Sequence, residues 1–99
     1  MMEHRLDTRV QAPIDVTLHT DRGDSVQTRA NNLSRGGVCV EIENAWGLKE
    51  NKLVLVEFME ERLPTKIPAL VIQATRTTAS LMFIEYSSEL HAFLSNQHR

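Results

Sequence analysis

The 99-residue sequence is poor in cysteine, in aromatic side chains and in long apolar runs. Cys39 is its single cysteine, so the chain has no internal disulfide framework, which favours a reducing compartment. No apolar run approaches the ~20 residues that a membrane-spanning helix needs, and the first residues lack the apolar stretch of a signal peptide. These absences predict a cytoplasmic protein that does not insert into a membrane.

The sequence also lacks an excess of basic side chains. Its formal net charge is −2 at pH 7, and 5% of its residues are aromatic. Proteins that bind DNA or RNA polymers rely on basic side chains that neutralise many phosphates. The charge therefore argues against a nucleic-acid-binding barrel, but it is compatible with a small anion held by two or three local arginines.

Clusters that could bind a metal or perform catalysis are scarce as well. The four histidines, His4, His19, His91 and His98, have no cysteine or carboxylate partner at the spacing of metal ligands. A catalytic role for Cys39 would need a histidine partner that the sequence does not indicate. We therefore expect no metal, no cofactor and no enzymatic activity.

A chain of this length forms one domain with one core. Apolar and polar residues alternate from Val10 to Leu18, which is typical of a strand with one buried face. Pro13 cannot donate a ladder hydrogen bond, so this strand is expected at a sheet edge or with a bulge. Further short strands separated by turn residues are predicted at about 26–31, 38–43, 52–59, 65–76 and 79–86.

The last two predicted features concern the C-terminal part of the chain. Strand 52–59 is apolar on both faces, so its second face is expected to meet the C-terminal segment. A helix is predicted at about 87–97, because Ser87 can cap its start and Leu90, Phe93 and Leu94 form an apolar stripe. Six strands and one helix predict an all-β-dominated antiparallel barrel or sandwich, closed at one end by the helix.

The stretch Asn31–Val38 joins the second and third strands and concentrates polar residues and glycines. Gly36 and Gly37 can adopt positive φ without a Cβ penalty and let a ligand approach the backbone closely. The Asn32 amide and the Ser34 hydroxyl both donate and accept hydrogen bonds, which suits the edge of a nucleobase. A turn stabilised by these side chains explains the same residues equally well, so both interpretations stay open at this point.

Residues 1–9 are rich in charged side chains and show no apolar period. This pattern predicts a flexible N-terminal arm in front of a barrel domain of residues 10–99. Arg5 and Arg9 lie four residues apart in the arm. They would share one face of a helix, or close on one target from two sides of a bent loop.

Arg5-x-x-x-Arg9 before the first strand, and Asn32-x-Ser34-x-x-Gly37 between the second and third, resemble the two-part signature of the PilZ domain. That signature is RxxxR followed by [D/N]xSxxG. The resemblance covers essentially the whole chain and implies a stand-alone PilZ domain. It also implies a six-stranded antiparallel β-barrel with a C-terminal α-helix, in agreement with the order of elements above.

The resemblance implies that the ligand is the bacterial second messenger cyclic di-GMP. It assigns Arg5 and Arg9 to the phosphates and guanine faces, because guanidinium forks bind phosphate and stack on purines. It assigns Asn32 and Ser34 to a guanine edge, with Gly37 keeping the turn open beneath. Asn32 stands where many members have aspartate, and a neutral amide accepts more weakly, so weaker binding than in those members is expected.

Three neighbours of the signature are further candidates for ligand contacts: His4, Arg35 and Gly36. The position of His4 influences, in this family, whether one ligand or a stacked pair binds. Arg35 could reach a phosphate or remain in water, and Gly36 adjoins the signature glycine.

Two functions follow from the resemblance. The first is a cyclic di-GMP receptor, in which the ligand orders the arm on the barrel and changes the surface offered to a downstream protein partner. The alternative is a degenerate PilZ-like adaptor that binds a protein and no nucleotide. Both halves of the signature are present, which favours the receptor, and ligand-induced thermal stabilisation distinguishes the two.

Overall fold

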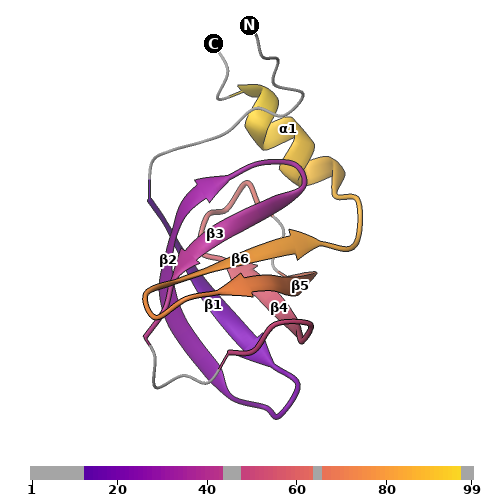
Figure 1. Cartoon of the computed structure of the whole chain (residues 1–99). Helices are drawn as coiled ribbons and strands as arrows, with labels where there is room; N and C mark the ends of the chain where they lie inside the picture. The colour runs from indigo at the N-terminus through magenta and orange to yellow at the C-terminus, as the bar shows by residue number, and fades with distance from the viewer. Residues whose placement is uncertain (1–12, 44–47, 64–65, 97–99) are drawn as a thin grey trace, which may run out of the picture.

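The computed structural model describes residues 13–43, 48–63 and 66–96. Within these residues it contains six strands followed by one helix. The elements are β1 (Ile14–Thr20), β2 (Ser25–Leu33), β3 (Gly37–Glu41), β4 (Leu53–Phe58), β5 (Ile67–Ala74), β6 (Thr78–Phe83) and α1 (Ser88–Asn96). Every strand pairs antiparallel with two neighbours in a closed barrel of order β1-β2-β3-β6-β5-β4 (Figure 1). The prediction of a six-stranded antiparallel barrel with a C-terminal helix is confirmed.

β1 has a partner on each side, because it pairs with β2 along one edge and with β4 along the other. Pro13 lies immediately before Ile14, the first paired residue, so its missing N–H removes no bond from the ladder. Neither pairing of β1 contains a register shift. The expectation that this strand is an edge or contains a bulge is therefore wrong.

β2 is longer than expected and contains a bulge. Consecutive residues of β3 pair with Ala30 and Asn32, so Asn31 is an extra residue in β2. The bulge reverses the alternation of side chains, and Ala30 and Leu33 are both 1% exposed although they are three residues apart. Leu33 therefore belongs to the core and to β2, not to the connecting turn as the sequence indicated.

The barrel interior is filled by apolar side chains from all six strands. Those that are essentially inaccessible include Leu18, Leu33, Leu81, Val16, Val40, Val56 and Val71. Alternation is seen as predicted in the first part of β5, where Ile67, Ala69 and Val71 are buried. In β1 the predicted inward residues Val16 and Leu18 are buried, but Thr17 between them is buried as well, at 8% exposure.

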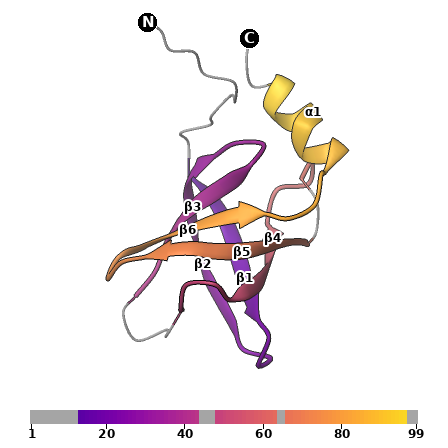
Figure 2. The ribbon, with the colours of Figure 1, turned by 45° about the vertical axis from the view of Figure 1, so that its right-hand side comes forward.

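α1 begins after Ser87, whose hydroxyl accepts a hydrogen bond of 3.1 Å from the N–H of Leu90. Leu90, Phe93 and Leu94 are at most 5% exposed and join the barrel core. The guanidinium of Arg62, which follows β4, lies 4.9 Å from the centroid of the Phe93 ring. Figures 1 and 2 show α1 at the end of the barrel where the β2–β3 turn and the end of β6 lie. The predicted capped helix is thus confirmed over residues 88–96.

The second face of β4 is not covered by the C-terminal segment. Val54, Val56 and Phe58 point into the core, whereas Leu53 and Leu55 are 52% and 39% exposed. α1 has one apolar stripe, and it packs on the core at the end of the barrel rather than on its side. The expected contact between β4 and the C-terminal segment is therefore wrong.

No helix in the described part of the chain is long and apolar enough to cross a membrane.

Candidate ligand-binding site

The start of β1 lies close to the second half of the signature, residues 32–37. β1 begins at Ile14, which pairs with Ala30, two residues before Asn32. The N-terminal segment of the chain therefore enters the barrel beside the point where β2 leads into the β2–β3 turn. That is also the end at which α1 lies (Figure 2).

His4, Arg5 and Arg9 lie outside the described residues, so their contacts stay predictions. Covalent geometry nevertheless limits their reach. Arg9 is five residues from Ile14, and an extended chain spans at most about 3.6 Å per residue, so its Cα lies within about 18 Å of Ile14.

Ser34 opens the β2–β3 turn and is 5% exposed. Its N–H donates a hydrogen bond of 2.9 Å to the carbonyl of Gly37, and its hydroxyl makes a longer contact of 3.4 Å to the same oxygen. The serine-stabilised turn, one of the two interpretations of this stretch, is therefore present. A hydroxyl oxygen carries two acceptor lone pairs in addition to its donor, so a ligand contact is compatible with this role.

Gly37 is the first residue of β3, and its neighbour across the ladder is β6. A Cβ at this position would overlap the backbone carbonyl of Leu81. Among the described residues, positive φ occurs at Gly23 and Asn51. Gly36 and Gly37 therefore do not use the positive φ that is open to glycine. Glycine is required at position 37 because β3 approaches β6 too closely for a side chain.

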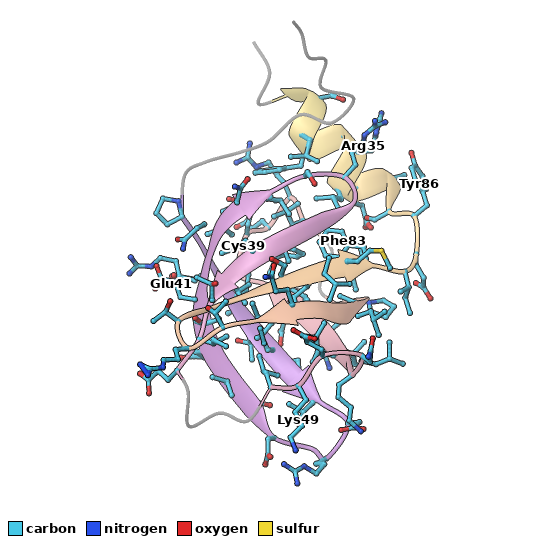
Figure 3. All side chains as sticks on the ribbon, in the orientation of Figure 1. Arg35, Cys39, Glu41, Lys49, Phe83 and Tyr86 are labelled. Atoms are coloured by element: carbon cyan, nitrogen blue, oxygen red, sulfur yellow. The ribbon has the colours of Figure 1, made fainter. Side chains whose placement is uncertain are left out.

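Arg35 and Gly36 form the exposed tip of the turn. The Gly36 carbonyl accepts a hydrogen bond of 2.9 Å from the N–H of Phe83, which ties the turn to the end of β6. Figure 3 places Arg35 at the α1 end of the barrel, together with Tyr86. Arg35 is thus a basic group at the signature turn itself.

Asn32 belongs to a row of polar side chains that runs from β2 across β3 to β6. It pairs with Cys39 of β3, which in turn pairs with Ser80 of β6, and all three are half-buried. The row presents an amide, a thiol and a hydroxyl beside the turn. Cys39 and Ser80 were not predicted beside the site, because the pairing between β3 and β6 leaves no local signal in the sequence.

Two larger hollows lie near the barrel wall and are poorer candidates for an anionic ligand. A cleft of about 900 Å³ adjoins the bulge at Asn31, and three acidic side chains line it with one basic one: Asp15, Glu41, Glu43 and Arg29. An acidic lining repels phosphates. A hollow of about 530 Å³ lies at the opposite end, beside the β1–β2 hairpin, and is remote from the signature.

The charged groups that follow β4 form a surface pair. Arg62 Nε donates a 3.0 Å hydrogen bond to Glu60, which lowers the pKa of Glu60 and raises the pKa of Arg62. Both groups are in contact with solvent, where such pairs stabilise little. No group of three potential metal-ligating side chains occurs within 13–43, 48–63 and 66–96.

Comparison with known proteins identifies the fold. A model of the PilZ domain family matches residues 3–96, which confirms the resemblance inferred from the signature. The Bacillus subtilis inhibitor of motility MotI/DgrA superposes with a TM-score of 0.76 at 18% identity, over 99% of this chain and 55% of that one. The present chain thus spans about half the length of that protein.

Two further solved structures share the fold. The PilZ domain of CeSA from a cellulose-synthesizing bacterium superposes with a TM-score of 0.75 at 18% identity, over 92% of this chain and 98% of that one. The PilZ domain of YcgR from Escherichia coli, solved with c-di-GMP, gives a TM-score of 0.73 at 17% identity, over 96% and 88%. No curated protein matches the sequence.

Proposed function

Because the chain belongs to the PilZ domain family, we propose that it is a receptor for cyclic di-GMP. One observation supports the proposal: β1 begins at Ile14, which pairs with Ala30 close to Asn32 and the serine-closed turn. The segment that bears Arg5 and Arg9 precedes β1 in the chain, and in the proposed complex it folds over this turn. The c-di-GMP-bound domain of YcgR has the same fold, which supports the assignment.

In the proposed complex, Arg5 and Arg9 bind the phosphates and stack on guanine, while Asn32 and Ser34 contact one guanine edge. A hydrogen bond to a charged group contributes about 1.5–3 kcal/mol. Micromolar affinity requires about 8 kcal/mol in total. Two arginines, a pair of base-edge contacts and a stack therefore suffice, even after the free energy needed to order the arm is subtracted.

The output of the receptor is a change of surface. Residues 1–9 become ordered over the ligand, and a downstream protein partner recognises the rearranged face. The chain acts as a binding module and does not convert the nucleotide. We place it in the bacterial cytoplasm, where this messenger acts and where the reducing environment keeps a thiol such as that of Cys39 free.

The direct test is a calorimetric titration of the purified chain with cyclic di-GMP, with GMP as the control nucleotide. We expect micromolar binding of the cyclic dinucleotide, with a stoichiometry of one ligand or a stacked pair, and no comparable binding of GMP. Melting temperature should rise with ligand concentration as RT ln(1 + [L]/Kd) requires. A flat titration and an unchanged melting temperature would leave the adaptor function, without nucleotide, as the better account.

Asn32→Asp should tighten cyclic di-GMP binding. A carboxylate accepts hydrogen bonds from the guanine donors about twice as strongly as an amide. We expect a gain of about 1 kcal/mol, or roughly fivefold in affinity. Asn31→Asp is the matched control, because it adds the same charge at the adjacent bulge residue. If both variants changed the affinity equally, Asn32 would not contact the base.

A further inference from the structure

The outer face of β4, β5 and β6 carries a cluster of apolar side chains that solvent reaches. We call this cluster the apolar face; its members are Leu53, Leu55, Leu70, Ile72, Met82 and Ile84. Leu53 and Ile72 are 52% and 51% exposed, and Ile84 and Met82 are 48% and 42% exposed. Scattered single apolar residues are normal on a surface, whereas a contiguous patch marks an interaction site.

Strand register shows that the apolar face is contiguous. Two rows cross the three strands, one made of Leu53, Leu70 and Met82 and the other of Leu55, Pro68 and Ile84. Neighbouring strands are about 4.8 Å apart, and residues two apart in a strand are separated by about 6.8 Å. The side chains of one row therefore touch those of the next, with no polar side chain between them.

The two ends of the apolar face carry opposite charge. At the end where β4 begins, Lys49 and Lys52 are exposed beside Glu50, whose carboxylate accepts a hydrogen bond from the N–H of Ala74. Two lysines and one glutamate leave this end with a net charge of +1. Figure 3 shows Lys49 at the end of the barrel remote from α1.

The opposite end is acidic. Glu57 follows Leu55 on the same outer face of β4, and Glu85 follows Ile84. Lys66 lies at this end too, and Glu57 is hydrogen-bonded to His19 Nε2 of β1 at 2.7 Å. With a neutral histidine, Glu57, Glu85 and Lys66 give a net charge of −1. Along the strand direction, the face therefore runs from a basic end through an apolar centre to an acidic end.

We propose that the apolar face is a homodimer interface on which a second copy of the chain docks. Two copies related by a two-fold axis that lies in the plane of the face and across the strands would run antiparallel. Each basic end then opposes the partner's acidic end, and the contact forms twice by symmetry. A two-fold axis along the strands would instead bring like charges together, so charge selects the antiparallel arrangement.

The size of the apolar face sets the expected strength of the dimer. A stable interface buries about 800 Å² on each partner. The apolar face is smaller than this and would form only the centre of such an interface. The dimer should therefore dissociate on dilution through micromolar concentrations. This inference does not depend on the proposed nucleotide ligand and is tested in its absence.

Sedimentation velocity of the full chain without nucleotide, from micromolar to several hundred micromolar, tests the interface. We expect a monomer–dimer equilibrium that Met82→Glu shifts at least tenfold towards the monomer. Gln27→Glu is the control, because Gln27 is exposed on β2, which does not contribute to the apolar face. A native chain that stays monomeric throughout, or equal effects of the two substitutions, would overturn the proposal.

Charge exchange tests the antiparallel arrangement. Lys52→Glu makes both ends acidic, and Glu85→Lys makes both ends basic, so each variant alone should dimerise more weakly than the native chain. Mixed in equal amounts, the two variants should form a heterodimer at least as readily as the native dimer, because both end contacts become complementary. Recovery on mixing also excludes misfolding as the cause of the single losses. A mixture that stays monomeric would contradict the proposed axis.

Discussion

Gly37→Ala is expected to destabilise the barrel whether or not a nucleotide is present. The new methyl group would overlap the carbonyl oxygen of Leu81, which belongs to the backbone of β6. A flexible side chain could rotate away from such a contact, but a strand held in a closed barrel cannot. Overpacking costs about 1–3 kcal/mol and occasionally more, and we expect at least about 2 kcal/mol here. For a domain of this size that lowers the melting temperature by roughly 10 °C.

Urea unfolding followed by circular dichroism measures this loss directly. Gly36→Ala is the matched control, because Gly36 is exposed at the tip of the turn and its φ is not in the left-handed region. The control should unfold close to the native midpoint. Equal midpoints for Gly37→Ala and the native chain would show that β3 and β6 can separate without cost, contrary to the packing seen here.

A loss of stability at Gly37 would change the meaning of the signature. Three of its residues lie in or beside the β2–β3 turn, and two of them have structural roles there. Ser34 closes the turn through the carbonyl of Gly37, and Gly37 lets β3 approach β6. Asn32 is a half-buried residue of β2, the strand that leads into this turn, and its contact with a guanine is part of the proposed function. The structure thus explains two of the three motif residues by folding alone.

The features that the sequence predicted correctly are those that depend on local periodicity. Alternation in β5 placed Ile67, Ala69 and Val71 in the core, and the structure buries all three. Ser87 was predicted as a helix cap, and its hydroxyl accepts the N–H of Leu90. Both signals are contained within a few consecutive residues, so no knowledge of tertiary contacts was needed.

The errors arise where a residue's environment is decided by a distant strand. The bulge at Asn31 reverses the alternation of β2, so a strict period of two placed Leu33 in the turn. The outward side chains Leu53 and Leu55 were expected to be covered by the C-terminal segment. In the closed barrel β4 lies between β1 and β5, and these two side chains are exposed to solvent.

The same limit applies to the candidate site. The sequence located Asn32 and Ser34 at the strand connection, because the motif is local. It could not show that Cys39 and Ser80 extend the row beyond Asn32, since that depends on the register of β3 with β6. It also could not distinguish a glycine needed for φ from a glycine needed for space.

Arg9→Ala is expected to weaken cyclic di-GMP binding by at least about 2 kcal/mol, or roughly thirtyfold. Arg9 is the signature arginine nearer to β1 in the sequence, and the proposed complex places its side chain on a phosphate or a guanine face. Its guanidinium can bind two phosphate oxygens at once or stack on a guanine, and Arg5, the other signature arginine, has contacts of its own in the proposed complex. Calorimetric titration with cyclic di-GMP gives the affinity of the native chain and of the variant under the same conditions.

Two further variants separate the fork from its charge. Arg9→Lys keeps the positive charge but loses the bidentate geometry, so it should recover only part of the affinity. Arg22→Ala removes an equal charge from the β1–β2 hairpin, at the opposite end of the barrel, and should bind like the native chain (Figure 1). If Arg9→Ala and Arg22→Ala lost the same affinity for cyclic di-GMP, the loss would be explained by the change in net charge alone. Native-like affinity in Arg9→Ala would remove Arg9 from the site and, with it, the arm-closing mechanism of the receptor.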